Sequence, residues 1–249
     1  MARWLLTLTL LAACHKPSTT PDVARPQVPA NVLFLGNSYT FVNDLPAMTV
    51  RFAEAGGAQV RQASVTLGGA TLAGLLGQTA ALATIAQGGW SHVVLQGQSL
   101  EPAADRAPFL AAAQTLADAV HKTGAAVAFY QTWPRQPGDA VYQQPWSGGS
   151  APALGQKLRD GYQQAATRAG GVRVPVGDAW QLALTQHPEI ALYQPDGSHP
   201  QVAGTYLAAC VFAVTLFHVD ASAVTWTPAG LAAADASALR TICRQVVVH

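Results

Sequence analysis

The chain has 249 residues, of which 50% are hydrophobic and only 11% are charged, and its formal net charge is +1. This length is typical of one α/β domain behind a short leader, and the apolar content is sufficient for one buried core. The near-neutral charge and the lack of a basic run argue against nucleic acid as a partner.

The first residues have the pattern of an export signal. Arg3 precedes an apolar stretch over residues 4–13, which is shorter than the roughly 20 residues that a membrane-spanning helix needs. Leu11-Ala12-Ala13-Cys14 resembles a bacterial lipobox, in which the leader is cleaved before a lipidated cysteine. We therefore expect a signal peptide at 1–13 and an exported protein, anchored in the cell envelope to a bacterial membrane by lipid on Cys14. The alternative is an ordinary secretory signal with an incidental Cys14.

Residues 14–30 contain four prolines together with Ser and Thr, a composition typical of a tether. One folded domain is expected over residues 31–249. If Cys14 carries lipid, Cys210 and Cys243 remain in an oxidising compartment, where they either form a disulfide or stay as buried thiols. The Cys and His spacings match no metal-binding pattern, so no metal site is expected.

Downstream of the tether, short apolar runs alternate with longer helical segments. The pattern predicts strands over residues 31–35, 59–65, 91–95, 125–131 and 172–176. It predicts helices over residues 48–55, 71–86, 107–123, 153–169, 201–217 and 229–246. This alternation implies βαβ units, so we expect an α/β fold: a three-layer α/β/α flavodoxin-like domain with about five parallel strands. Segment 133–150, rich in Pro, Gly and Gln, is expected to be a long loop at the carboxyl end of the fourth strand, where such sheets bind ligands.

Four polar segments lie where predicted strands end or a helix begins. Gly36-Asn37-Ser38 follows the first strand, where a sharp turn can project a serine nucleophile into a cleft. Gly68-Gly69 follows the second strand and can present backbone N–H groups to an anion. Gln96 and Gln98 end the third strand, and their amides can donate to an oxyanion. In Asp196-Gly197-Ser198-His199, Asp196 can orient His199 as a general base.

Each segment alone also fits a plain turn, but together they have a distinctive order. A serine first, donor loops next and Asp-x-x-His last resemble the SGNH (GDSL-type) hydrolases over roughly residues 31–217. The resemblance implies Ser38 as nucleophile, His199 and Asp196 as its partners, and the backbone N–H groups of Ser38 and Gly69 in the oxyanion hole.

One block departs from the family pattern. Gln96-Gly97-Gln98-Ser99 replaces the usual Gly-x-Asn-Asp and is similar to the Gln-Gly-Glu-Ser variant of sialate and xylan acetylesterases. This likeness implies Gln96 as the side-chain donor to the oxyanion, with Gln98 as the competing choice.

The resemblance implies a secreted serine esterase that needs no metal or organic cofactor. Its expected substrates are small-molecule or carbohydrate esters with short acyl groups, such as acetyl esters of sugars. Trp133, which follows the fourth strand, either lines the substrate pocket or covers the core. The alternatives are a cell-envelope acyltransferase that uses the same residues, and a non-catalytic ligand-binding module on the same fold.

Overall fold

The computed structural model describes Met1 and residues 29–247. The expected signal peptide, Cys14 and almost all of the expected tether lie outside the described residues. The described helices include none that is both long and apolar enough to cross a membrane.

Five parallel strands form the single sheet of residues 29–247, in the order β2-β1-β3-β4-β5. The strands are β1 (Ala30–Gly36), β2 (Val60–Thr66), β3 (His92–Leu95), β4 (Ala126–Tyr130) and β5 (Val172–Val174). The predicted parallel α/β sheet is confirmed, although the fifth strand is two residues shorter than expected.

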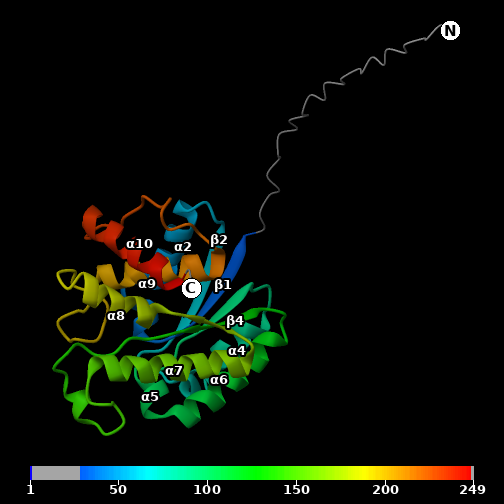
Figure 1. Cartoon of the computed structure of the whole chain (residues 1–249). Coiled ribbons are helices and arrows are strands. Elements are labelled where there is room, and N and C mark those ends of the chain that lie inside the picture. Colours follow the sequence, from blue (N-terminus) through cyan, green and yellow to red (C-terminus); the bar gives the residue numbers. More distant parts are fainter. Residues whose placement is uncertain (2–28, 248–249) are drawn as a thin grey trace.

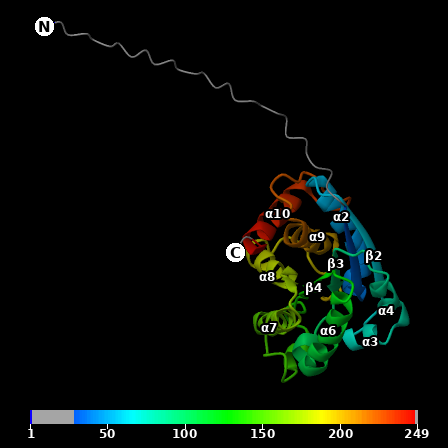
Figure 2. The same ribbon diagram turned by 90° about the vertical axis from the view of Figure 1, so that its right-hand side faces the viewer.

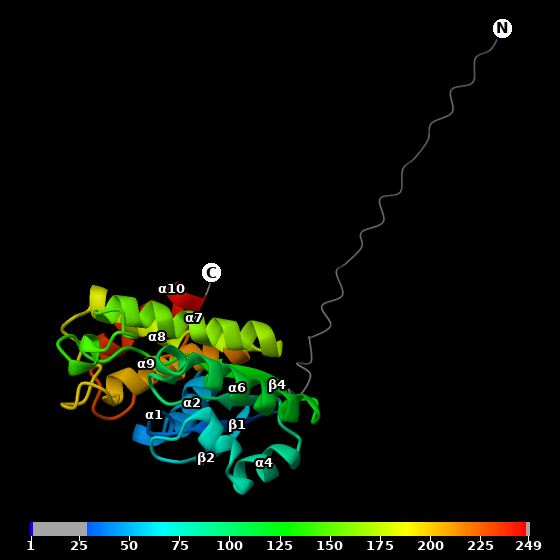
Figure 3. The same cartoon turned by 90° about the horizontal axis from the view of Figure 1, so that it is seen from below.

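Helices cover both faces of the sheet (Figures 1 and 2). One layer contains α2 (Leu45–Ala55), α8 (Val176–Gln186), α9 (Val202–Phe217) and α10 (Ala233–Val247). The other contains α3 (Leu72–Leu76), α4 (Thr79–Ala86), α6 (Arg106–His121) and α7 (Ala151–Ala169). Figure 3 shows this second layer in the order α7, α6, α4. The short helices α1 (Ser38–Phe41) and α5 (Glu101–Ala104) follow β1 and β3.

The central strands are apolar on both faces because both faces are covered. In β1, Val32 and Phe34 pack on the layer with α9, whereas Leu33 and Leu35 pack on the layer with α6. Such continuous burial is typical of parallel strands between two helical layers. It accounts for the uninterrupted apolar run in the sequence.

Two helical segments differ from expectation. The helix expected over residues 71–86 is divided into α3 and α4 around Gly77, which caps the end of α3. Helix α8 was not expected, although its buried residues Val176, Ala179, Trp180 and Ala183 have helical spacing. Cys210 and Cys243 are both buried and unbonded, so the structure shows two free thiols instead of a disulfide. Burial and the neighbouring Cys243 thiol raise the pKa of Cys210.

Candidate active site

Ser38 lies where β1 turns into α1, at the carboxyl edge of the sheet. Asn37 caps this helix, and its side chain accepts a hydrogen bond from the Tyr39 N–H at 3.1 Å. Gly36 is required at the preceding position, because a Cβ there would lie 2.5 Å from the side-chain oxygen of Gln96. The turn therefore presents Ser38 as the first residue of a helix, with its backbone N–H free of an intrahelical acceptor.

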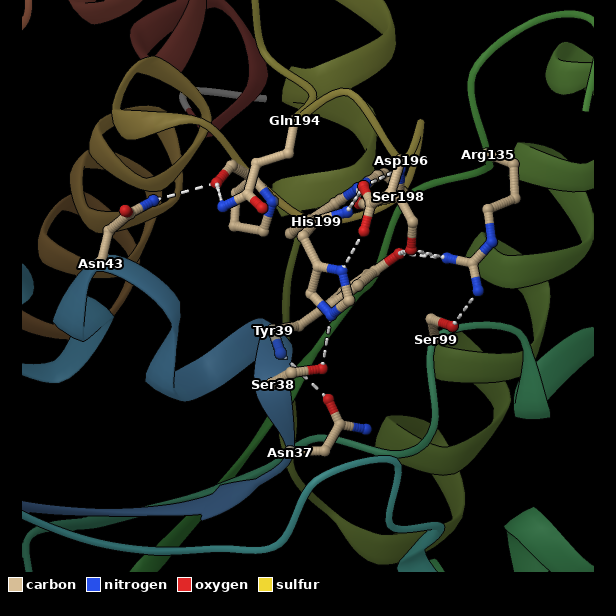
Figure 4. Close-up of polar contacts among 12 residues, drawn as sticks. Asn37, Ser38, Tyr39, Asn43, Ser99, Arg135, Gln194, Asp196, Ser198 and His199 are labelled. Atoms are coloured by element: carbon tan, nitrogen blue, oxygen red, sulfur yellow. Dashed lines mark hydrogen bonds and ion pairs between the residues drawn. The ribbon is translucent and has the colours of Figure 1, made fainter.

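His199 and Asp196 lie on the loop between α8 and α9 (Figure 4). The Nε2 atom of His199 is 2.8 Å from the Oγ atom of Ser38, and its Nδ1 atom is 2.5 Å from the Oδ2 atom of Asp196. The other carboxylate oxygen of Asp196 accepts the N–H groups of Ser198 and His199, each at 2.9 Å. The loop thus fixes the carboxylate, and the carboxylate fixes the imidazole.

Asp196 remains partly open to solvent, with 47% of its side chain exposed, against 32% for His199. Its partial burial would by itself raise the pKa of the carboxyl group. The hydrogen bonds from His199 and from two backbone N–H groups outweigh this effect and hold the pKa of Asp196 below its usual value. At neutral pH the carboxylate is therefore charged beside the imidazole.

Ser38 and Gly69 both line one cavity. The backbone N–H groups of these two residues have no hydrogen-bond acceptor within residues 29–247. Gly69 has a φ of +68°, a conformation that side chains disfavour, so glycine suits this position. Both expected backbone donors are thus present beside the serine and available to an anion.

The two candidate amides occupy different environments. Gln98 lines the cavity, and its amide nitrogen donates to the Oγ atom of Ser99 at 3.0 Å. Gln96 is fully buried, accepts the N–H of Asn37 at 2.9 Å and the hydroxyl of Thr40 at 2.8 Å, and donates to Asn37. Gln96 is therefore absent from the cavity walls, whereas Gln98 forms part of them. Through Asn37 and Thr40, Gln96 supports the turn that carries Ser38.

The buried carboxylate of Glu101 forms hydrogen bonds with both donor loops, the one that follows β2 and the one that follows β3. One oxygen of Glu101 accepts the N–H of Gln98 at 2.9 Å and the N–H of Leu72 at 3.1 Å. Burial raises the pKa of Glu101, although these two hydrogen bonds oppose the shift. No local sequence pattern marks Glu101 as a site residue, because its two partners belong to separate loops.

Trp133 does not line the cavity. It is fully buried between Tyr39 and Trp180, with ring centroids 4.4 Å and 3.9 Å away and nearly parallel planes. Its indole N–H donates to the carbonyl oxygen of Ser198 at 3.1 Å. Of the two expected positions for Trp133, the structure shows the one in the core, where the ring packs against Tyr39 and Trp180.

Arg135 was also missed by the sequence analysis. Its guanidinium group donates to the hydroxyls of Tyr39, Ser198 and Ser99, the last at 3.0 Å (Figure 4). Burial raises the pKa of Tyr39, and the charge of Arg135 opposes that shift. The long loop after β4 was expected to serve the site, but no local pattern distinguished Arg135 within it.

The cavity has a volume of about 230 Å³. Its walls are formed by Asn37, Ser38, Tyr39, Gly69, Gln98, Ser99, Arg135, Ser198 and His199. Within residues 29–247, no group of three or more His, Cys, Asp or Glu side chains is placed to hold a metal ion. The arrangement is suited to nucleophilic attack by a serine, with donors nearby for a developing negative charge.

The parallel sheet and the aligned Ser, His and Asp define the class of flavodoxin-like α/β hydrolases. A protein from Slackia heliotrinireducens assigned to the SGNH hydrolases shares 31% sequence identity and a TM-score of 0.63, with 75% of this chain and 98% of that chain covered. The chain belongs to the SGNH hydrolase family and is an enzyme of this type. No known family model and no curated protein sequence matches it.

More distant structures share the fold. A DUF4886 family protein from Bacteroides uniformis has a TM-score of 0.77 at 17% identity, with 89% of this chain and 96% of that chain covered. A variant of an acetyl-xylooligosaccharide esterase from Geobacillus has a TM-score of 0.58 at 15% identity, with 74% and 94% covered.

Proposed function

We propose that the chain is an exported serine esterase that hydrolyses carboxylic esters with short acyl groups through Ser38, His199 and Asp196. One observation carries this proposal: an unbroken line of hydrogen bonds runs from Asp196 through His199 to the hydroxyl of Ser38. A phosphate- or sugar-binding module has no need of an imidazole directed at a serine. A serine nucleophile requires one to take its proton.

In the proposed reaction, His199 transfers protons between Ser38, the leaving alcohol and water. His199 accepts the hydroxyl proton of Ser38 at Nε2 while the Oγ atom of Ser38 attacks the ester carbonyl. The tetrahedral intermediate collapses, and His199 gives that proton to the departing alcohol, which leaves an acyl-enzyme. His199 then takes a proton from water, the hydroxide adds to the acyl carbon, and the proton returns to Ser38 as the carboxylic acid leaves.

We assign the oxyanion hole to the N–H groups of Ser38 and Gly69 and to the amide of Gln98. The backbone donors have no other acceptor within the described residues, and Gln98 is the only one of the two candidate amides on the cavity wall. Donors that are already in place cost no reorganisation when negative charge develops on the carbonyl oxygen.

The cavity volume favours a short acyl group. Pockets for drug-sized ligands are typically about 300–1,000 Å³, and this cavity is smaller. The Geobacillus structure is that of an acetyl-xylooligosaccharide esterase, which agrees with acetyl as the acyl group and a carbohydrate as the alcohol. We therefore propose acetylated carbohydrates as the first substrates to examine.

Hydrolysis of p-nitrophenyl acetate by wild type and by Ser38→Ala tests the proposal. We expect the variant to lose at least ~10³-fold in kcat, because no other group in the cavity replaces the nucleophile. Ser64→Ala, which removes an exposed hydroxyl from β2, is the matched control and should retain wild-type activity. Equal activity of Ser38→Ala and wild type would overturn the assignment of Ser38.

Acetylated xylo-oligosaccharides then test the substrate and the acceptor. Release of free acetate that depends on Ser38 supports hydrolysis. Transfer of the acetyl group to an added sugar, without free acetate, would instead identify an acyltransferase. Comparison of acetyl with octanoyl aryl esters tests the short-acyl proposal, which fails if the longer ester is the better substrate.

We further propose that the enzyme is exported and held at a bacterial membrane by lipid on Cys14. The support is the lipobox-like sequence that ends at Cys14, together with the apolar stretch before it.

A further inference from the structure

A positive charge without an acidic partner lies on the wall of the cavity. Arg135 and His199 line this cavity, and no Asp or Glu side chain does. Within residues 29–247, no carboxylate forms an ion pair with Arg135. The carboxylate of Asp196 is already hydrogen-bonded to His199. The charge of Arg135 is thus available to whatever occupies the cavity.

The guanidinium group is held in place by neutral groups only. Tyr39, Ser198 and Ser99 each accept one hydrogen bond from it through a hydroxyl oxygen. A guanidinium group has five N–H donors. Three hydrogen bonds leave the Nε–H and one Nη2–H of Arg135 without an acceptor in the described part of the chain. The side chain is therefore pre-oriented and still able to donate.

The three hydroxyls also connect Arg135 to the reacting groups. Tyr39 follows Ser38 directly, Ser198 precedes His199 directly, and Ser99 accepts from the amide of Gln98. Figure 4 shows Arg135 to the right of Ser38 and His199, with its guanidinium group directed toward Ser198 and Ser99. A group bound to Arg135 therefore lies close to the ester that Ser38 attacks.

We propose that the cavity recognises esters that carry a carboxylate within a few bonds of the scissile ester, and that Arg135 is the residue that binds this carboxylate. The inference rests on the proposed function and adds to it the charge of the substrate. A carboxylate matches the planar donor fork of arginine and forms charge-assisted hydrogen bonds with it. A neutral ester of the same shape forms only the weaker uncharged ones.

Two matched substrate pairs test the proposal, each with an anion and its neutral amide. Monomethyl succinate and methyl succinamate place the charge on the acyl side, whereas acetoxyacetate and acetoxyacetamide place it on the alcohol side. In at least one pair, wild type should show about 10-fold higher kcat/KM for the anion, mainly through a lower KM. A ratio near one in both pairs would overturn the proposal.

Substitution of Arg135 distinguishes binding of the substrate carboxylate from a purely structural role of this side chain. In Arg135→Gln the ratio of anion to amide should fall to near one, and Arg135→Lys should keep part of it. Arg61→Gln removes the same charge from an exposed position on β2 and should leave the ratio unchanged. If Arg135 only supports the site, Arg135→Gln will slow both members of a pair equally, and the proposal is wrong.

The neutral amides keep the two proposals distinguishable. If wild type hydrolyses them and Ser38→Ala does not, the esterase proposal holds whatever the selectivity is. An absent preference for the anion then rejects only the role of Arg135. If wild type hydrolyses none of the four compounds and no aryl ester, the proposed function fails and the inference fails with it.

Discussion

Asp196 is the residue on which the orientation of His199 depends. Asp196→Asn keeps the shape of the side chain but removes its charge, and its amide can hold the imidazole in the wrong tautomer. We expect kcat to fall by about 10³–10⁴-fold while KM changes little. Steady-state kinetics on p-nitrophenyl acetate measure this effect. Asp160→Asn, on the exposed face of α7, is the control, and a loss below 10-fold in Asp196→Asn would contradict the triad.

The two glutamines that follow β3, Gln96 and Gln98, should respond differently to substitution. Gln98→Ala removes a cavity donor, so we expect kcat to fall by about 10²-fold. Its stability should fall less than that of Gln96→Ala, because the N–H of Leu100 that loses its acceptor is only partly buried. Gln96→Ala leaves the buried N–H of Asn37 without its acceptor, so we expect a loss of about 2 kcal/mol in the free energy of unfolding. Urea unfolding and steady-state kinetics on both variants measure the difference. Loss of activity in Gln96→Ala, with activity retained in Gln98→Ala, would instead identify Gln96 as the oxyanion donor.

Glu101 makes stability depend on pH in a predictable direction. Burial raises the pKa of this carboxyl group, so the folded chain binds its proton more tightly than the unfolded chain does. Stability is therefore lost as pH rises from the unfolded pKa through the raised folded pKa. Glu101→Gln removes the titration. The free energy of unfolding of wild type minus that of the variant should decrease as pH rises above the usual pKa of a glutamate carboxyl group, about 4.

Urea unfolding at several pH values measures this difference for Glu101→Gln. Glu54→Gln, which changes an exposed carboxylate on α2, serves as the control and should show a smaller pH dependence. A difference between wild type and Glu101→Gln that stays constant with pH would show that Glu101 titrates alike in both states.

At the scale of the elements, sequence patterns predicted the strands better than the helices. Each strand is a short apolar run that ends near Gly or a polar residue, and burial on both faces preserves that signal. Helix α8 begins directly after β5 without a side-chain cap, so its start resembled the end of a strand. The split at Gly77 needed knowledge of packing, since one continuous helix also satisfies the local pattern.

Some residues of the candidate site could be predicted from the sequence and others could not. Short motifs next to a strand or helix indicated four residues of the candidate site: Ser38, Gly69, Asp196 and His199. Arg135 could not be found, because its partners Tyr39 and Ser198 lie 96 and 63 residues away in sequence. Nor could Gln98 be distinguished from Gln96: β3 ends at Leu95, and strand alternation gives no direction beyond that residue.

The aromatic stack connects packing to the loop that carries His199. Trp133→Leu removes a fully buried ring between Tyr39 and Trp180, so we expect a loss of about 3 kcal/mol in the free energy of unfolding. Trp133→Phe keeps an aromatic ring but loses the hydrogen bond to the Ser198 carbonyl, which should cost about 1 kcal/mol. Urea unfolding measures both variants, and a neutral Trp133→Leu would show that the stack does not support the domain.

At the scale of the whole molecule, the entry of the chain and the active site lie at opposite ends of β1. The strand begins at Ala30, the last residue of the expected tether, and Ser38 follows its carboxyl end. Seven strand residues at roughly 3.3 Å each separate these ends by about 20 Å. Ala30 and the proposed nucleophile Ser38 thus lie at opposite edges of the sheet.

This arrangement predicts that membrane attachment and catalysis are independent. Cys14→Ser removes the thiol that would carry lipid, so the protein should move from the membrane fraction to the soluble fraction after export. Its kcat on p-nitrophenyl acetate should equal that of wild type, because the cavity faces away from the amino end of β1. Fractionation followed by activity assays measures both effects. Cys210→Ala, which changes a buried thiol of the domain, should remain with the membrane, and retention of Cys14→Ser there would exclude lipid on Cys14 as the sole anchor.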